Sequence, residues 1–266
     1  MKIIVPVKQV PESSNVKMDP VTGTVIRAGI ENVVNPLDLY ALEAALILKD
    51  LYKGTITAVT MGPPPAIKVL KEAIAMGCDE AVLVSDRKFS GSDTYATSYT
   101  LSQVIKKIGN FDIIITGERA TDGDTAQVGP GIAAWLDLPL ATYVSKIIDV
   151  KENRLYVRRL VEEGYQELSV PFPCLISVVK EIASPRLPTL NGKIKSMSVN
   201  YQTFSTENTE FNESYLGLKG SPTKVVNIYT PKIARSGKSI TVTDDISLDQ
   251  ACDAIIELLE NNGVLR

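Results

Sequence analysis

The sequence predicts an α/β fold: a mostly parallel, doubly wound sheet with helices on both faces, an antiparallel extension, and a C-terminal arm plus helix. Strand-like and helix-like segments alternate over roughly the first 140 residues, and short strands without intervening helices follow them. A long polar stretch then precedes one amphipathic segment. Alternation of strand and helix is typical of a parallel sheet with right-handed connections.

The alternating half contains four predicted strands. β-Branched or apolar runs predict strands at residues 2–8, 55–60, 81–85 and 111–116. Apolar residues at helical spacing predict helices at 36–49 and at about 66–76, 94–108 and 125–136. Residues 16–26, turning at Pro20–Gly23, predict a small hairpin between the first strand and the first helix.

The second half is irregular. Short strands at 143–150, 154–161, 166–170 and 174–178 predict an antiparallel extension over residues 142–180. Residues 184–245 have few long apolar runs, so we expect them to be disordered or to form an arm laid over another protein. Residues 247–260 predict an amphipathic helix that docks on its own chain or on a partner, and the long polar connection favours a second subunit.

Composition narrows the class of protein. The chain has 266 residues, 44% of them hydrophobic, enough for one large core. It lacks a long apolar run, and its start is charged too early for a signal peptide, so we expect a cytoplasmic protein without membrane insertion. The 28 Lys and Arg against 31 Asp and Glu give a net charge of −3 without a basic stripe, which argues against a nucleic-acid partner.

The chain contains no histidine. This excludes Ser-His and Cys-His nucleophile pairs and histidine-ligated metals within the chain. Cys78, Cys174 and Cys252 are far apart in the sequence, so we expect small buried apolar residues and no metal site.

The loop at residues 116–131, TGERATDGDTAQVGPG, directly follows a predicted strand. It places backbone N–H groups and hydroxyls at a strand's carboxyl end, where α/β sheets bind nucleotides. Asp124 and Gln127 match the spacing of a capping box, so Asp124 is predicted to cap the next helix. We therefore assign phosphate contacts to the Thr125 hydroxyl and to the N–H groups of Gly123, Thr125, Gln127 and Val128. Taken alone, the loop is also explained by a turn that needs glycine only for its dihedral angles.

Two further loops support a phosphate-bearing cofactor. In residues 90–98, SGSDTYATS, Ser92 and Asp93 suit a helix N-cap, and the Thr94 and Thr97 hydroxyls are spaced to donate to one diphosphate at the start of the helix. In residues 60–65, TMGPPP, the glycine behind the strand lets a ribose or adenine lie against the backbone.

Several motifs resemble the beta subunit of electron transfer flavoproteins: VPVKQV at 5–10, NPLD at 35–38, MG at 61–62, AMG at 75–77 and DGDTAQVGP at 122–130. The resemblance runs through nearly the whole chain. It implies a heterodimer with an alpha subunit that carries an electron-relaying FAD, while the beta subunit holds an adenine nucleotide. It also implies that oxidoreductase activity requires the alpha subunit and a flavin-dependent dehydrogenase.

The resemblance leaves two nucleotides open, since family members carry either AMP or, in the electron-bifurcating type, a second FAD. The segment DTYAT at 93–97 resembles the bifurcating pattern and favours FAD. This FAD is then expected to accept hydride from NADH and to send electrons to ferredoxin or flavodoxin and, through the alpha-subunit FAD, to the dehydrogenase. The alternatives are a docking subunit with structural AMP and a stand-alone adenine-nucleotide sensor.

The resemblance and the loops together give the predicted site. No side chain is expected to be catalytic, because the flavin supplies the chemistry. The predicted cofactor-binding residues are Val7, Lys8, Asn35, Asp38, Thr60, Met61, Gly62, Asp93, Thr94, Ala96, Thr97, Gly123, Asp124, Thr125, Gln127, Val128 and Gly129.

Residues 183–191 resemble the recognition loop of the family, which inserts a leucine into the dehydrogenase. Leu190 holds that position here, although a leucine folded onto its own subunit is the simpler alternative. We therefore predict a nucleotide-binding domain at 1–183, and a second region at 184–266 with the recognition loop, a partner-wrapping arm and the C-terminal helix.

Overall fold

The structure is a computed structural model that describes residues 1–12, 31–226 and 239–264. It divides the chain into two compact units, Met1–Asn227 and Ile228–Arg266. The hairpin predicted at 16–26 lies outside the described residues.

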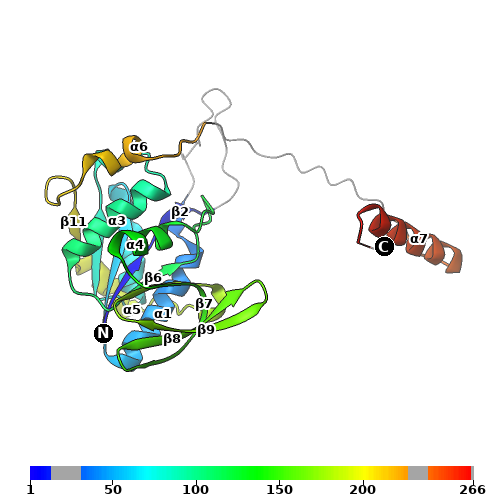
Figure 1. Ribbon diagram of the computed structural model, residues 1–266, viewed down its shortest axis with the longest axis horizontal. Coiled ribbons are helices and arrows are strands. Elements are labelled where there is room, and N and C mark those ends of the chain that lie inside the picture. The colour runs from blue at the N-terminus through cyan, green and yellow to red at the C-terminus, as the bar shows by residue number, and fades with distance from the viewer. Residues whose placement is uncertain (13–30, 227–238, 265–266) are drawn as a thin grey trace. The chain divides into compact units, whose positions relative to one another are not determined.

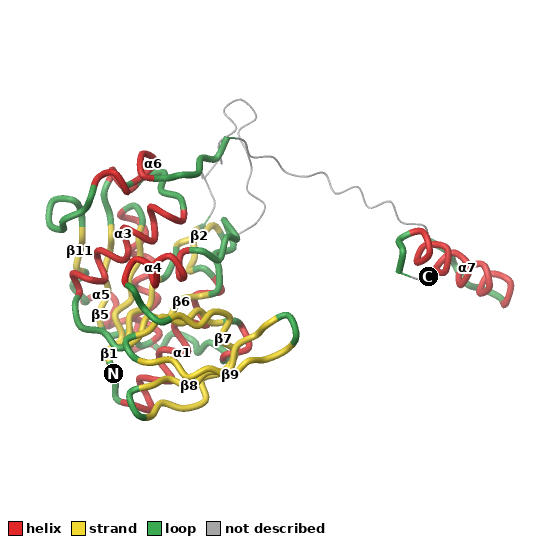
Figure 2. Tube along the Cα trace, viewed as in Figure 1, coloured by secondary structure: helices red, strands yellow, loops and turns green. Residues whose placement is uncertain are grey.

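A nine-stranded sheet forms the centre of the first unit within the described ranges, in the order β11-β5-β4-β1-β6-β10-β7-β8-β9. Each neighbouring pair from β11 to β7 is parallel, whereas β7, β8 and β9 pair antiparallel. Figure 2 shows the strands in yellow. The strands are β1 (Lys2–Pro6), β4 (Thr55–Met61), β5 (Glu80–Val84), β6 (Ile113–Gly117), β7 (Leu140–Lys151), β8 (Arg154–Val161), β9 (Gly164–Pro171), β10 (Cys174–Val178) and β11 (Gln202–Phe204). β2 (Gln9–Pro11) and β3 (Asn32–Val34) form a separate antiparallel pair.

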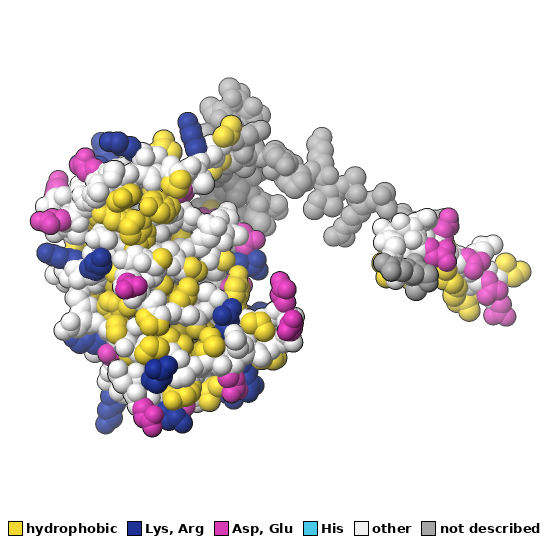
Figure 3. Space-filling model, in the orientation of Figure 1, with side chains coloured by type: hydrophobic (Ala, Val, Ile, Leu, Met, Phe, Trp, Pro, Cys, Tyr) yellow, Lys and Arg dark blue, Asp and Glu magenta, His cyan; other side chains and the backbone are white. Residues whose placement is uncertain are grey.

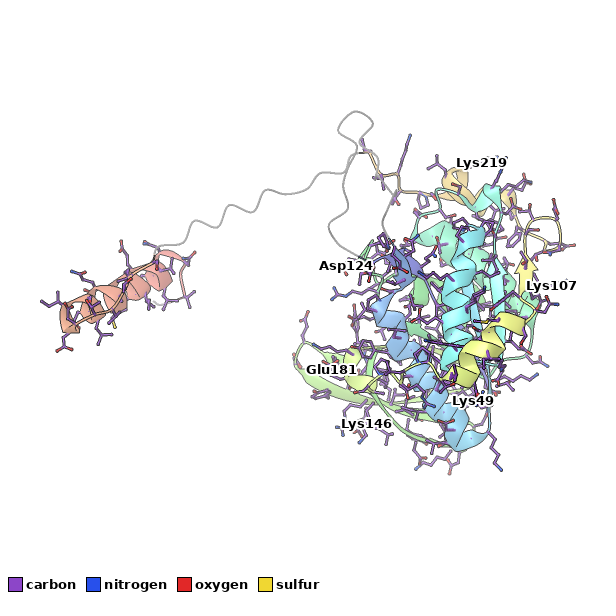
Figure 4. The ribbon with its side chains drawn as sticks, turned by 180° about the vertical axis from the view of Figure 1, so that it is seen from behind. Lys49, Lys107, Asp124, Lys146, Glu181 and Lys219 are labelled. Carbon is purple, nitrogen blue, oxygen red and sulfur yellow. The ribbon has the colours of Figure 1, made fainter. Side chains whose placement is uncertain are left out.

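Helices cover both faces of the parallel sheet, as predicted. α3 (Thr94–Ile108) and α4 (Val128–Leu136) lie on the face seen in Figure 1. α1 (Pro36–Tyr52), α2 (Ile67–Met76) and α5 (Leu190–Ser198) lie on the opposite face, seen in Figure 4. The shorter helical segments are η1 (Pro64–Ala66), η2 (Arg87–Phe89), η3 (Lys180–Ile182), η4 (Glu213–Tyr215) and α6 (Gly217–Gly220).

Each face of the sheet has its own hydrophobic core. In β1, Ile3 and Val5 belong to the core under α1 and α2, while Ile4 belongs to the core under α3 and α4. Because successive side chains point to opposite faces and both faces are covered, the central strands are apolar throughout. This explains why the β-branched runs at 2–8 and 111–116 identified strands from the sequence.

One predicted strand was assigned to the wrong part of the sheet. Residues 174–178 were included in the antiparallel extension at 142–180, but β10 lies between β6 and β7 and is parallel to both. All five of its residues are buried, as expected for a strand covered on both faces. The chain therefore returns to the sheet interior after β9, and the antiparallel part contains only β7, β8 and β9.

Residues 184–226 lie within the region predicted to contain the partner-wrapping arm. They belong to the first unit, and β11 extends the sheet by pairing in parallel with β5. Phe204 and Leu216 are buried in the core under α3. The boundary between units thus follows Asn227 rather than residue 183. The few buried apolar residues of this segment stand singly in the sequence, so they show neither a helical nor a strand period.

The second unit contains α7 (Asp245–Asn261), which confirms the predicted C-terminal helix. Its N-terminus is a capping box between Asp244 and Ser247. Ile246, Ile255 and Leu258 are exposed on this helix. Across the described ranges, every helix falls short of the length and apolar character that a bilayer crossing requires.

Phe204 tests whether residues 184–226 are an integral part of the fold. Replacing this buried side chain by alanine is expected to lower the free energy of unfolding by ~3–5 kcal/mol, because it leaves a cavity in the core. The matched control is Thr203→Ala at the exposed neighbouring position, which should change stability by less than ~0.5 kcal/mol. Urea denaturation measures both, and equal small effects would show that β11 is not part of the cooperative unit.

Candidate functional site

The direction of the chain changes between β1 and β6. From β1 the chain passes through α1 to β4 on one side, whereas from β6 it passes through α4 and joins β7 on the other side. β1 and β6 are parallel neighbours, so their following loops leave the same edge of the sheet in opposite directions. In doubly wound sheets this switch point is where ligands bind.

Polar contacts join the two loops across this point. The Lys8 ammonium pairs with the Asp122 carboxylate at 2.7 Å. Asn35, fully buried, donates from Nδ2 to the Arg119 carbonyl at 2.9 Å and accepts from the Thr121 N–H at 3.2 Å. Asn35 therefore fixes the loop after β6 onto the start of α1.

Asp38 is buried beneath the same loops. Its carboxylate accepts the Lys8 N–H at 2.7 Å, and a Cβ added to Gly117 would lie 2.5 Å from its Oδ1. Burial raises the pKa of Asp38 to about 7, although the Lys8 N–H opposes the rise. The glycine at the end of β6 thus makes room for a carboxyl group that is held out of water.

The predicted capping role of Asp124 is wrong. α4 begins at Val128 rather than at 125, its N-cap is Gln127, and no side chain caps it. Asp124 and Ala126 have φ angles of 50° and 55°, a left-handed conformation that keeps the loop out of the helix. The Asp124 carboxylate, labelled in Figure 4, instead accepts a hydrogen bond from Arg119 at 2.8 Å.

The glycines of α4 have a packing role. A Cβ on Gly129 would lie 2.7 Å from Thr116 Oγ1, and one on Gly131 would lie 2.6 Å from Ser98 Oγ. These two glycines let α4 approach the end of β6 and the first turns of α3. The loop before α4 stays open, since Gly123, Thr125 and Gln127 are all exposed.

The start of α3 is capped as the sequence predicted. The Asp93 carboxylate accepts the N–H groups of Tyr95 and Ala96 at 3.0 Å each, and the N–H and hydroxyl of Thr223 at 2.9 and 2.7 Å. Although partial burial opposes it, hydrogen bonds from Ala96 and Thr223 hold the pKa of Asp93 below its usual value. Asp93 and the Ala96 N–H therefore shape the helix terminus and already have partners.

The two helix N-termini meet at a cleft. Thr94 Oγ1 donates to Gln127 Oε1 at 2.9 Å, which joins the start of α3 to the start of α4. The cleft has a volume of about 520 Å³. Its lining includes Tyr95, Gln127, Trp135, Pro222 and Thr223, but Thr97 is half-buried and does not line it. Apolar side chains gather on this face over α3 and α4 (Figure 3).

Two hydroxyls near this edge have no hydrogen-bond partner among the described residues. Thr60 Oγ1, near the end of β4, and Thr116 Oγ1, near the end of β6, are both buried. Met61 and Gly62 follow Thr60 and are only partly buried. Buried hydroxyls normally find a partner. The hydroxyls of Thr60 and Thr116, the exposed Gly123 and the neighbouring starts of α3 and α4 together fit a phosphorylated nucleoside.

Sequence reasoning missed part of the cleft. Trp135 packs against Tyr95, Tyr99 and Tyr215 in tilted or edge-to-face arrangements, with ring centroids 5.3, 5.1 and 5.4 Å away. Gln127, Gly131 and Trp135 follow one another at steps of four residues, which places them along one face of α4. The sequence could therefore have predicted that Trp135 lines the cleft. Thr223 could not have been predicted, because nothing in the polar segment SPT at 221–223 indicates a contact with α3.

The sheet and its switch-point loops define a doubly wound α/β protein with a candidate ligand site at the edge formed by β1, β4 and β6. The family model for the electron transfer flavoprotein domain matches residues 22–204. The chain belongs to this family, in its beta-subunit branch.

Three relatives are similar to this chain over most of its length. The chain is 46% identical to the electron transfer flavoprotein subunit beta of Megasphaera elsdenii, with 97% of this chain and 98% of the relative covered. It is 40% identical to the caffeyl-CoA reductase-Etf complex subunit CarD of Acetobacterium woodii, with both chains covered completely. It is 44% identical to the protein FixA of Azotobacter vinelandii, over 87% of this chain and 85% of the relative.

Asp38 makes the stability of the protein depend on pH. Its folded-state pKa of about 7 lies above the value near 3.9 in an unfolded chain, so the folded state binds more protons between these values. Stability is therefore expected to fall as pH rises from 4 to 7, by at most about 1.4 kcal/mol per pH unit from this group. Asp38→Asn should remove this contribution, as measured by urea denaturation at several pH values.

The exposed Asp137→Asn variant is the control and should follow the wild-type curve. If Asp38→Asn and wild type lose stability in parallel between pH 4 and 7, the Asp38 carboxyl is not perturbed by burial.

Proposed function

We propose that this chain is the FAD-binding beta subunit of an electron-bifurcating electron transfer flavoprotein. The observation that carries the proposal is the meeting of the two helix N-termini through Thr94 and Gln127, beside the switch point of the sheet. Membership of the electron transfer flavoprotein family supplies the flavin context. The chain acts together with an alpha subunit.

The site suits a diphosphate. Helix N-termini favour anions because their N–H groups and dipoles point toward the ligand, and the N-terminus of α4, which no side chain caps, lies beside the start of α3. The exposed loop adds the N–H groups of Gly123, Thr125, Gln127 and Val128 and the Thr125 hydroxyl. A dinucleotide carries two phosphates, so the Thr94 and Thr97 hydroxyls at the start of α3, added to the donors of the loop, favour FAD over AMP.

Negative side chains near the site are compensated. Asp122 pairs with Lys8, and Asp124 pairs with Arg119. Asp93 is satisfied by the α3 cap and by Thr223. Carboxylates that already have partners repel a bound phosphate less than free ones would. This supports the loop at 116–131 as a phosphate site despite its two aspartates and the nearby Asp93.

The remaining predicted residues have distinct proposed roles. Val7, Thr60, Met61 and Gly62 would lie against the adenosine portion, and Asn35 and Asp38 would hold the surrounding loops in place. When bound, FAD would supply hydride acceptance from NADH and one-electron transfer to ferredoxin or flavodoxin and to the alpha-subunit flavin. The chain itself would bind and orient the cofactor, a role that requires no histidine.

The proposed partner enzyme is a flavin-dependent dehydrogenase that docks at Leu190. This side chain is 75% exposed at the start of α5, and Leu187, Ile194 and Met197 are also exposed. Leu190 is therefore not folded onto the described part of its own chain, which supports the docking role. The name of the CarD relative, which includes a reductase complex, is consistent with such a partner.

Thr94 and Thr97 test the nucleotide site. Replacing both by valine should weaken the binding of FAD to the beta subunit at least about fivefold if each hydroxyl contributes ~0.5–1.5 kcal/mol. The alpha-subunit flavin should stay bound. Flavin absorbance after denaturation of the purified heterodimer gives the count, with Thr203→Val on β11 as the matched control. A total well below one flavin per heterodimer would reject this assignment, because the alpha-subunit flavin would then be lost as well.

Leu190 tests the docking role. Leu190→Ala should slow electron transfer to the dehydrogenase while the rate of flavin reduction by NADH stays at the wild-type value. An apolar anchor in a pocket typically contributes more than ~1 kcal/mol, so the KM for the dehydrogenase should rise at least fivefold. Leu218→Ala, at another exposed leucine, is the control. Unchanged coupling would exclude Leu190 as the anchor.

A further inference from the structure

Arg186 joins the segment before α5 to α1. Its guanidinium donates to both oxygens of Glu43, with Nη2–Oε1 at 2.9 Å and Nε–Oε2 at 3.0 Å. The Arg186 N–H also donates to Glu43 Oε2 at 2.9 Å. The Glu43 side chain is only 7% exposed, so this is a nearly buried carboxylate with three donors from one residue.

A second carboxylate completes the contact. Arg186 Nη2 lies 3.0 Å from Asp50 Oδ2, two helical turns beyond Glu43 on the same face of α1. The guanidinium is held by two carboxylates, and the backbone N–H of Arg186 is held by Glu43, so the whole residue has little freedom to turn. We call Arg186, Glu43 and Asp50 the α1 clamp.

The other end of the segment is fixed to α2. The Thr189 N–H donates to the Ala75 carbonyl at 3.1 Å, and the Thr189 hydroxyl caps α5 by accepting the Gly192 N–H at 2.9 Å. A Cβ on Gly192 would lie 2.1 Å from the Ala75 carbonyl oxygen, so only glycine permits this approach. The backbone is thus held on both sides of Leu187, which is 85% exposed.

These contacts leave the apolar residues facing outward on a fixed backbone. Leu187, Leu190, Ile194 and Met197 stay exposed while Arg186 and Thr189 bind inward. Binding is tighter when the docking residues are already ordered, because less conformational entropy is lost on association.

We propose that Arg186 is a positioning residue that holds the Leu190 surface in its docking conformation through the α1 clamp. This inference rests on the proposed docking role of Leu190. It assigns a task to Glu43 and Asp50, which lie on α1 outside the recognition loop.

Hydrogen exchange tests the clamp without the dehydrogenase. In the purified heterodimer, Arg186→Met should speed amide exchange in residues 184–198 about tenfold, while β1, β4 and β6 keep wild-type protection. Arg186→Lys keeps the charge but loses the two-pronged geometry and should give an intermediate rate. Arg158→Met, which breaks an exposed pair with Glu167, is the control and should leave residues 184–198 unchanged.

Unchanged exchange in residues 184–198 of both Arg186 variants would overturn the proposal. If Arg186→Met lowers protection throughout the sheet, that variant is destabilised as a whole, and Arg186→Lys becomes the test. The proposal then requires that Arg186→Lys speed amide exchange in residues 184–198 and nowhere else.

Electron-transfer kinetics then test the link to docking. Arg186→Met should raise the KM for the dehydrogenase about tenfold with kcat and flavin content unchanged, as expected when only the preorganisation of the docking surface is lost. A lower kcat with an unchanged KM would contradict this role. If Leu190→Ala leaves the KM for the dehydrogenase unchanged, the docking role of Leu190 is rejected. If Leu190→Ala raises this KM but Arg186→Met does not, only the role of the α1 clamp is rejected.

Discussion

The parallel pairing of β1 with β6 is the constraint on which the rest of the structure depends. Because the chain leaves these neighbouring strands in opposite directions, the loops behind them must part and create a place for a ligand. Asn35 and the Lys8–Asp122 pair hold the parted loops in a fixed relation. Gly117, Gly129 and Gly131 then allow α1, α4 and α3 to pack closely around them. The glycines in residues 116–131 are thus needed for the packing of the helices as well as for the conformation of the loop.

α1 connects the two functional regions of the first unit. It carries Asp38 in its first turn, under the candidate nucleotide site, and then Glu43 and Asp50, which bind Arg186. The same rigid helix therefore supports both the proposed cofactor site and the proposed docking surface. The residues that position these regions are polar or charged groups with matched partners, while those expected to contact ligands are hydroxyls, N–H groups and apolar side chains.

The parallel core could be predicted from the sequence because its strands are apolar on both faces and its helices have a regular period. The prediction failed where local signals compete with long-range contacts. Residues 174–178 read equally well as an edge or a central strand, and only pairing with β6 decides between them. Asp124 has the spacing of a helix cap, but its left-handed backbone and the Arg119 partner place it in the loop. Thr223 reaches α3 from 130 residues away in the sequence, a contact that no local pattern encodes.

The nucleotide content of the purified alpha–beta heterodimer tests the central claim most directly. Denaturation followed by chromatographic quantification of flavin and adenine nucleotides gives the stoichiometry. A beta subunit that grips a diphosphate at the starts of α3 and α4 predicts two FAD and no AMP per heterodimer. One FAD together with one AMP would contradict the account and leave the chain as a docking subunit without a redox cofactor of its own.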